Sequence, residues 1–397
     1  MMKKFKIPAI VFGGGMNGLG VVRNLGRNGV TAYCVVDRKD PVMSSGFCRK
    51  SYVVAHIQES VSVLRAFLMK IAKNLDDYAV LFSTNDLYSL HLSYLKGEFE
   101  GKYHVPLPSY KIVKTLVNKR EFYQSISKCS IPHPKTYFPE SHKDAKQISK
   151  EIRYPVFVKP SMSQTFSLKF HRKGFVATSE KDLMKYYLFA ENHKVDVIFQ
   201  EIIPGLSGRN MFGVEAYLDR NHYAKGLFGY IRLRGWPPVF GSTCLRESIS
   251  LKELANSYVM VENYLRILGY YGLMEAEWKR DPRDGIFKLL EINARQSMQN
   301  SLPARCGVNL VLMAYLDAIG EKVRYVDDYV EDFRWIDFLS NLQSIIKSKV
   351  SMTKLLGSLQ KVKEWSFFAA DDPKPWVASS LDTLEIVARR VLGLAKA

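Results

Sequence analysis

The residues with the clearest chemical potential lie in KLLEINAR, at positions 288–295. An apolar run here ends in a carboxylate, an amide and a guanidinium, carried by Glu291, Asn293 and Arg295. Successive side chains of a β-strand point to opposite faces, so Leu289, Glu291 and Asn293 are expected on one face. The pattern predicts a strand whose end presents polar groups for binding.

The stretch just upstream predicts a second strand with the same division. In LMEAEWK, at residues 273–279, apolar side chains alternate with Glu275 and Glu277. The sequence DPRDG between the two strands favours a turn, and therefore a hairpin. This hairpin would gather Glu277, Glu291 and Asn293 on one face, where hard oxygen ligands suit Mg²⁺. An ordinary solvated strand face is an equally good explanation of these acids at this stage.

Two lysines stand where an anion would neutralise them. Lys159 ends the apolar strand PVFVKP, and Lys119 lies on a helix in NKREF, before the strand-rich region. A buried lysine is costly unless an anion pairs with it, and a nucleotide phosphate would be such an anion. Taken alone, a strand-end lysine that extends to solvent is the commoner explanation of Lys159.

The order of elements predicts an α/β region followed by an α+β region. Residues 7–37 read as a strand, a glycine-rich turn, a helix and a second strand, which is how a doubly wound sheet begins. AVLFSTND, at residues 79–86, reads as a further buried strand. Ligands bind at the carboxyl ends of such strands, so Thr84, Asn85 and Asp86 either line a cleft or cap the next helix. Strands dominate the middle of the chain, and an amphipathic helix ends it.

Taken in order, these pieces resemble the ATP-grasp superfamily. NKREF, VKP, QEIIPG, Glu277 and EINAR follow one another as in that superfamily, over roughly residues 7–320. The chain is most similar to the carboxylate–amine ligase branch, near D-aspartate ligase and the ATP domains of carbamoyl-phosphate synthetase. The resemblance implies a Rossmann-like α/β domain at residues 1–115 and an α+β ATP-grasp domain of two lobes, with ATP between them, at 116–320. Residues 321–397 would form a helical extension.

The resemblance also implies a nucleotide-binding set. The residues expected to contact ATP are Lys119, Lys159, Lys169, Gln200, Glu201, Ile202 and Ile203. The lysines would meet phosphates, and residues 200–203 would form the hinge against which adenine lies, with backbone groups and Glu201 reading its edge.

A metal-binding and catalytic set follows from the same resemblance. Glu277, Glu291 and Asn293 would hold Mg²⁺, for which Mn²⁺ could substitute. Arg295 would lie near the γ-phosphate and, together with Lys159, would act in catalysis.

Some features depart from the family pattern. Ala294 stands where a proline usually follows the asparagine, and a basic, aromatic segment replaces the glycine-rich lid after VKP. No ribose ligand can be assigned, although Glu215 is a candidate. Arg232, Arg234 and Arg246 could grip a substrate carboxylate, or they could be surface groups.

The opening glycines allow a different reading. GGGMNGLG, at residues 13–20, resembles the GxGxxG turn of dinucleotide-binding proteins, and Asp37 ends the second strand. This motif is weak alone, and ATP-grasp proteins of this branch have similar first turns. The N-terminal domain is therefore expected to serve the substrate side, not a nicotinamide cofactor.

Composition limits the class of partner. The 57 basic and 39 acidic residues give a net charge of +18, which favours anionic partners. No block of Lys and Arg predicts nucleic-acid binding, and no apolar stretch has the length of a transmembrane helix. The five cysteines are scattered without metal-ligand spacing, which predicts free thiols in a reducing compartment, the cytoplasm.

The sequence thus predicts a Mg²⁺-dependent ATP-grasp ligase. It would join a small carboxylate to an amine through an acyl phosphate, forming an amide or peptide-like bond, and dimers are frequent among such proteins. The alternatives are a small-molecule kinase or a non-catalytic nucleotide-binding protein with the same fold. A basic protein that binds nucleic acid or a membrane surface is a further alternative.

Overall fold

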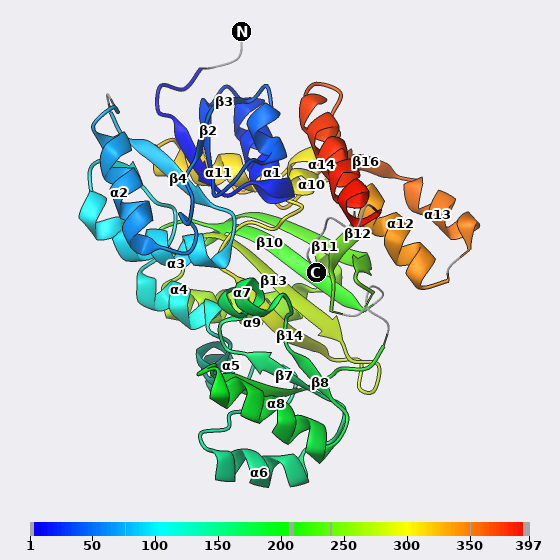
Figure 1. The fold of residues 1–397 in the computed structure, drawn as a ribbon. Coiled ribbons are helices and arrows are strands. Elements are labelled where there is room, and N and C mark those ends of the chain that lie inside the picture. Colours follow the sequence, from blue (N-terminus) through cyan, green and yellow to red (C-terminus); the bar gives the residue numbers. More distant parts are fainter. Residues whose placement is uncertain (1–3, 76, 206–209, 239, 350, 392–397) are drawn as a thin grey trace.

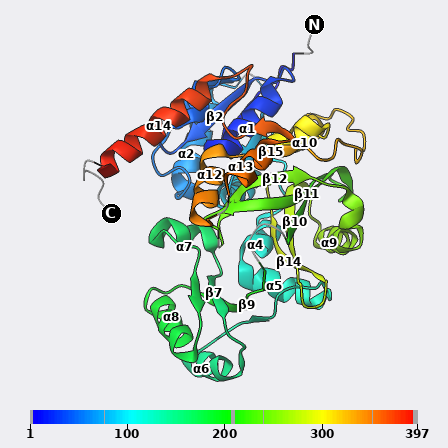
Figure 2. The same cartoon turned by 90° about the vertical axis from the view of Figure 1, so that its right-hand side faces the viewer.

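The computed structural model describes residues 4–75, 77–205, 210–238, 240–349 and 351–391, which contain three β-sheets. In Figure 1 a parallel sheet with its helices (blue to cyan) lies at the top, and a large central sheet (green to yellow) crosses the middle. A smaller sheet lies at the bottom. Figure 2, turned by 90°, shows the same three layers from the side.

The N-terminal sheet is parallel, with strands in the order β3-β2-β1-β4-β5. Its strands are β1 (Ala9–Phe12), β2 (Ala32–Val36), β3 (Cys48–Val53), β4 (Ala79–Ser83) and β5 (Tyr103–His104). The connecting segments contain α1 (Gly15–Gly26), η1 (Pro41–Ser44), α2 (Val61–Ala72), α3 (Asp86–Leu95) and η2 (Lys96–Phe99). Ala9 and Val11 pack into a core with α1, whereas Ile10 and Phe12 pack into a second core with α2 and α3. Helices therefore cover both faces of this sheet, so the predicted α/β start of the chain is observed.

The central sheet has the strand order β14-β13-β10-β11-β12-β15-β16. Its strands are β10 (Met211–Leu218), β11 (Ala224–Trp236), β12 (Ser242–Ser248), β13 (Gly272–Arg280), β14 (Phe287–Asn293), β15 (Arg334–Ile336) and β16 (Val362–Trp365). One face packs against α4 (Tyr110–Val117), α5 (Lys119–Lys128) and α9 (Ala255–Leu268), which follows η3 (Leu251–Glu253). The other face packs against α10 (Ser301–Cys306) and α11 (Leu310–Ala318). Because α11 also contacts the core around α1, this helix joins the central sheet to the N-terminal domain.

The small sheet is antiparallel, with strands in the order β6-β9-β7-β8. Its strands are β6 (Thr136–Tyr137), β7 (Val156–Pro160), β8 (Phe175–Ala177) and β9 (Val197–Glu201). Helices α6 (His142–Glu151) and α8 (Glu180–Asn192) cover its outer face, and α7 (Ser163–Phe170) follows β7. Figure 1 shows this lobe below the hairpin β13–β14.

The C-terminal segment is not only helical. It contains α12 (Phe338–Lys347), α13 (Met352–Leu359) and α14 (Lys374–Val391), but β15 and β16 within it extend the central sheet. The prediction of a helical extension at 321–397 was therefore wrong in part, because two short strands there pair with β12 and with each other. The other domain boundaries stay predictions. Among the residues that the structure describes, no helix combines the length and the apolar character needed to cross a bilayer.

A buried ion pair attaches the C-terminal segment to the N-terminal domain. Arg23 of α1 donates from Nε to Asp372 Oδ2 at 2.9 Å, and both side chains are 2% exposed. The same carboxylate accepts from Ser45 Oγ at 2.7 Å and from the Gly46 backbone N–H at 2.8 Å. Removal of the Asp372 carboxylate would therefore leave three donors without this acceptor: Arg23 Nε, the Ser45 hydroxyl and the Gly46 N–H.

We predict that Asp372→Ala lowers the free energy of unfolding by about 3–5 kcal/mol, because it strands a buried guanidinium. The matched control is Asp371→Ala, whose ion pair with Arg27 is 32% and 51% exposed, and for which we expect a loss of less than about 1 kcal/mol. Chemical denaturation of both variants measures the difference. Equal, small losses would contradict the assignment.

Candidate active site

The predicted hairpin forms and sets two carboxylates directly opposite each other. β13 and β14 pair antiparallel, with Glu277 opposite Glu291 and Glu275 opposite Asn293. The DPRDG turn closes around Asp281, whose buried carboxylate accepts from the side chains beside it. The hairpin prediction is confirmed.

A β-bulge changes which residues share a face. The register shifts between Glu277 and Trp278, so Leu290 is the extra residue and Leu289 lies opposite Trp278, in the apolar core. The prediction that Leu289 shares a face with Glu291 and Asn293 was wrong, because an inserted residue resets the alternation of side chains.

The two facing carboxylates have opposite electrostatic surroundings. Burial, and then the charge of Glu291, raise the pKa of Glu277. Lys119 foremost, with Lys159 and Lys173 adding to it, holds the pKa of Glu291 well below its usual range despite burial. Like charges this close need a proton or a cation between them. Because lysines already neutralise Glu291, Glu277 is the carboxylate of the pair that is suited to binding an added cation.

The lysines around Glu291 carry more positive charge than this carboxylate neutralises. Lys119, buried at the start of α5, donates from Nζ to Glu291 Oε2 at 2.8 Å. Lys159 is the next-to-last residue of β7, and its Nζ lies 5.6 Å from the centroid of the Tyr123 ring. Burial, and then the charge of Lys119, lower the pKa of Lys159 to about 7. A half-buried lysine whose charged form is disfavoured in this way is suited to binding an anionic ligand.

Arg295 is held from the N-terminal domain as well as from its own strand end. Its Nε donates to Asp86 Oδ1 at 2.9 Å, and its Nη2 donates to Asn293 Oδ1 at 3.3 Å. Asn85 caps α3 by accepting from the Tyr88 backbone N–H at 3.0 Å, so the capping interpretation holds for Asn85. Asp86 instead faces the site, and a guanidinium with five donors can bind an anion at the same time.

The predicted adenine hinge lies beside the strand of Lys159. β9 carries Gln200 and Glu201, and Ile198 pairs with Lys159 across the two strands. The Glu201 carboxylate lies 2.6 Å from Arg283 Nη2 and accepts from the Lys135 backbone N–H at 3.2 Å. Its side chain is therefore already engaged. An adenine contact of residues 200–203 stays a prediction, and it rests on their backbone groups.

Lys169 makes no contact with the other predicted site residues among those that the structure describes. It lies exposed in the last turn of α7, with its Nζ 5.2 Å from the centroid of the Phe170 ring. Lys173, four residues later, is the lysine of this segment whose charge acts on Glu291. The segment after VKP forms a helix here, and Gln164 Oε1 accepts from the Leu87 backbone N–H of α3 at 3.0 Å.

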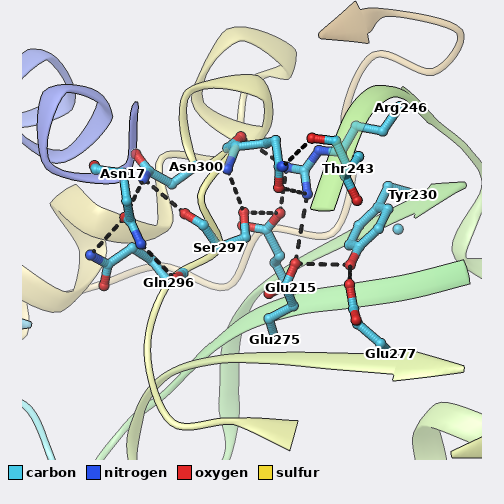
Figure 3. A network of polar contacts seen from close by, with 12 residues as sticks. Asn17, Glu215, Tyr230, Thr243, Arg246, Glu275, Glu277, Gln296, Ser297 and Asn300 are labelled. Atoms are coloured by element: carbon cyan, nitrogen blue, oxygen red, sulfur yellow. Dashed lines mark hydrogen bonds and ion pairs between the residues drawn. The ribbon is translucent and has the colours of Figure 1, made fainter. Parts of the chain in front are cut away.

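A buried polar network runs from the carboxylates to the N-terminal domain (Figure 3). The Tyr230 hydroxyl lies 2.8 Å from Glu275 Oε1 and 3.1 Å from Glu277 Oε1. Arg246 Nη1 lies 3.8 Å from Glu275 Oε1, and Arg246 Nη2 lies 2.5 Å from Glu215 Oε1. Ser297 also donates to Glu215, at 2.8 Å.

The network ends at α1. Asn300 Nδ2 donates to Asn17 Oδ1 at 2.9 Å, and Asn17 Nδ2 donates to the Thr84 backbone carbonyl at 2.7 Å. Gln296 Nε2 donates to the same Asn17 oxygen at 3.2 Å. The loop that follows Arg295 is thus fixed to the first helix of the chain, and Figure 3 shows these amides next to one another.

These contacts decide several earlier alternatives. Glu215 is not placed to bind ribose, because its carboxylate is 1% exposed and paired with Arg246. Arg246 is wholly buried and lies 4.4 Å from the centroid of the Tyr230 ring, so it positions Glu275 within the network. Arg232 donates to the Gly241 carbonyl and Arg234 donates to Asn341 and Ser358, so both are engaged within the chain.

The glycine-rich turn does not offer a free phosphate site. The Asp40 carboxylate accepts from the Gly15 backbone N–H at 2.9 and 3.0 Å, at the N-terminus of α1. A Cβ at Gly13 would lie 2.0 Å from Thr84 Oγ1, so that glycine serves close packing. The Asp40 carboxylate therefore occupies the position at the N-terminus of α1 where a dinucleotide pyrophosphate would bind.

In the described part of the chain, no group of three or more His, Cys, Asp or Glu side chains forms a metal site. The predicted ligand set contains only two carboxylates, and its third member is the amide of Asn293. Its role as a metal site stays a prediction.

Comparisons with known proteins identify relatives. The chain is 27% identical over 252 residues to D-aspartate ligase of Enterococcus faecium (strain Aus0004), which covers 61% of this chain and 59% of the relative. The match therefore spans less than two thirds of that enzyme. No protein-family model matches the chain.

Solved structures share its architecture. Biotin carboxylase of Campylobacter jejuni, in a β,γ-ATP complex, superposes with a TM-score of 0.65 at 17% identity, over 83% of this chain and 74% of that one. For N5-carboxyaminoimidazole synthetase of Staphylococcus aureus the TM-score is 0.66 at 12% identity, over 88% of this chain and 86% of that one. The chain has the ATP-grasp fold. The predicted fold is therefore confirmed, and the similarity to D-aspartate ligase agrees with the predicted carboxylate–amine ligase branch.

Sequence reasoning missed some members of this candidate site. Glu275 is buried between Tyr230 and Asn293, and burial, with Glu277 and Glu215, raises its pKa to about 8. The alternation of Glu275 with Glu277 is visible in the sequence, but the pairing of Glu275 with Asn293 depends on the bulge at Leu290, which counting residues from the turn does not reveal. The pairing of Asp86 with Arg295 joins residues 209 positions apart, so no local pattern predicts it.

The lysine cluster of the ATP-grasp site yields a prediction about protonation. Because Glu291 raises the pKa of Lys159, Glu291→Gln should bring that pKa below its value of about 7. The control is Glu277→Gln, whose charge acts more weakly on Lys159, so the shift should be smaller. NMR titration of ¹³C-methylated lysines, assigned with Lys159→Arg, measures both. A Lys159 that titrates above pH 9 in the unaltered protein would refute the assignment.

Proposed function

We propose that this protein is an ATP-dependent carboxylate–amine ligase that forms an amide or peptide-like bond through an acyl phosphate. The observation that carries the proposal is the pair Glu277 and Glu291, set opposite each other beside Lys119 and Lys159. Carboxylates that can bind a cation therefore lie next to ammonium groups that can bind an anion. The similarity to D-aspartate ligase supports the same reaction class.

The charge pattern fits a magnesium nucleotide. Glu277, Glu291 and Asn293 would hold Mg²⁺, with Mn²⁺ able to replace it, and phosphate oxygens and water would complete the coordination. The raised pKa of Glu277 fits this role, because burial and the charge of Glu291 disfavour its ionised form, which a bound cation would favour. Bound there, the ion would neutralise charge on the phosphates.

The residues of the chain would orient the reactants and offset their charge. Lys119 and Lys159 would bind the phosphates, and an ammonium with a pKa of about 7 gains most from such an anion. Residues 200–203 would bind adenine through their backbone. Lys173, rather than Lys169, would reach the phosphates from the segment after VKP.

The bonds change in two steps. A carboxylate oxygen of the first substrate attacks the γ-phosphorus of ATP, and ADP leaves. The amine nitrogen then attacks the acyl carbon, phosphate leaves, and the nitrogen loses a proton. Arg295, fixed by Asp86, would offset the charge on the transferred phosphoryl group. Positioning supplies the remaining rate enhancement.

The relative suggests the first compounds to test. Its name, D-aspartate ligase, makes D-aspartate the first amine to supply, with peptides and amino acids as carboxylates. A homodimer and a cytoplasmic location also belong to the proposal. The free cysteines support a reducing compartment.

We expect ADP release that requires Mg²⁺, a carboxylate and an amine together. Glu291→Ala should reduce this turnover by at least about 10²–10³-fold, because it removes a group that acts on the transferred phosphate through both metal and lysines. The control is Glu253→Ala, an exposed acid of η3, which should leave turnover unchanged. A coupled ADP assay over panels of acids and amines measures it. Unchanged turnover in Glu291→Ala would remove the assigned site.

An isotope experiment tests the route. With an ¹⁸O-labelled carboxylate substrate, one labelled oxygen should appear in inorganic phosphate, because that oxygen attacks the γ-phosphorus and leaves with it. Mass spectrometry of the released phosphate detects it. Stable phosphorylated product without amine would indicate a kinase, and label in AMP would indicate an adenylate.

A further inference from the structure

A cavity lies at the opposite end of α1 from Asn17. Its volume is about 580 Å³, and its walls come from the last turn of α1, from α10, from β16 and from residues 368–371. Figure 1 shows α10, β16 and α14 together on this side, away from the hairpin β13–β14. A cavity of this size is within the range that holds small ligands.

Most charges near this cavity already have partners. Arg27 is held by Asp371 through two hydrogen bonds of 2.8 Å, and Arg23 is held by Asp372. Each of these two ion pairs is neutral overall. Glu364, which also lines the cavity, belongs to neither pair and is 8% exposed.

The remaining charges are one buried acid and two exposed bases. Glu364 has Ser301 as its hydrogen-bond partner and, within the part of the chain that the structure describes, no ion pair. Arg305 and Lys363 line the same cavity, and both are exposed. Burial raises the pKa of Glu364 to about 7, against the opposing charges of Arg27, Arg23 and Arg305. Glu364 is buried whereas Arg305 and Lys363 are exposed, and Trp365 and Phe368 also line the cavity.

We propose that this cavity binds a free α-amino acid, and that acidic amino acids bind most tightly. The ammonium of the ligand would meet Glu364, and its carboxylates would meet Arg305 and Lys363. One acid and two bases complement one ammonium and two carboxylates, whereas a neutral amino acid satisfies only one base. Charge-assisted hydrogen bonds of this kind are the stronger ones.

The cavity is distinct from the ATP site but is connected to it by contacts. Asn24, on its wall, donates from Nδ2 to the backbone carbonyl of Asn300 at 3.0 Å and to its Oδ1 at 3.1 Å. Asn300 then donates to Asn17. The inference does not depend on the proposed ligase activity, since it uses none of the residues assigned to ATP.

Calorimetry on the nucleotide-free full chain tests the proposal. The probes are L- and D-aspartate, L- and D-glutamate, glycine, and succinate, which lacks the ammonium. We expect the acidic amino acids to bind more tightly than glycine or succinate. Arg305→Gln and Glu364→Gln should each weaken their binding about tenfold or more, as the loss of a charged hydrogen bond does. The control Lys322→Gln, an exposed cation outside the cavity, should change nothing.

Two further variants separate this cavity from a substrate site. Binding should persist in Arg295→Ala, and in Trp365→Phe the heat should remain while any ligand-induced change in tryptophan fluorescence is lost. Absence of binding by every probe, or full affinity in both cavity variants, would overturn the proposal. Loss only in Arg295→Ala would assign the ligand to the ATP cleft instead. Because Arg305 is exposed, Arg305→Gln provides the test even if Glu364→Gln does not fold.

Discussion

The repulsion between Glu277 and Glu291 is the constraint on which the rest of the site depends. A hairpin that sets two carboxylates opposite each other is unfavourable unless positive charge is near. Here Lys119 neutralises Glu291 directly, while Glu277 lies 3.1 Å from the Tyr230 hydroxyl and, in the described part of the chain, forms no ion pair. The fold tolerates this local cost because the opposite faces of both strands lie in the main apolar core with Trp278 and Leu289.

The same constraint explains why three separate parts of the chain meet at the hairpin. Lys119 comes from a helix beneath the central sheet, Lys159 from the small sheet, and Asp86 from the N-terminal domain. Lys119 and Lys159 supply positive charge near Glu291, and Asp86 supplies negative charge to Arg295. The buried network from Glu275 to Asn17 joins the central sheet to the N-terminal domain, since its members are hydrogen-bonded to one another.

Much of the site could be predicted from the sequence, because its signals are local. Alternation, the DPRDG turn and the strand-end positions of Lys159 and Asn293 each follow from a few neighbouring residues. The failures are of other kinds. The bulge at Leu290 needs the partner strand, and the engagement of Glu201 by Arg283 needs the hairpin turn beside β9. Strands β15 and β16 are three and four residues long, too short to show a period.

The segment after VKP is basic and aromatic where related proteins have a glycine-rich lid. This difference changes how the segment can bind phosphate. A glycine-rich loop would offer backbone N–H groups to phosphates, but residues 163–170 form a helix, in which most of those groups bond within the helix. Side-chain charge therefore takes a larger part in any phosphate binding by this segment, and the charge of Lys173 acts on Glu291. Gln164 joins the start of the same helix to α3, whose first residue, Asp86, holds Arg295. The segment after VKP and Arg295 are thus both attached to the first turn of α3, which belongs to the N-terminal domain.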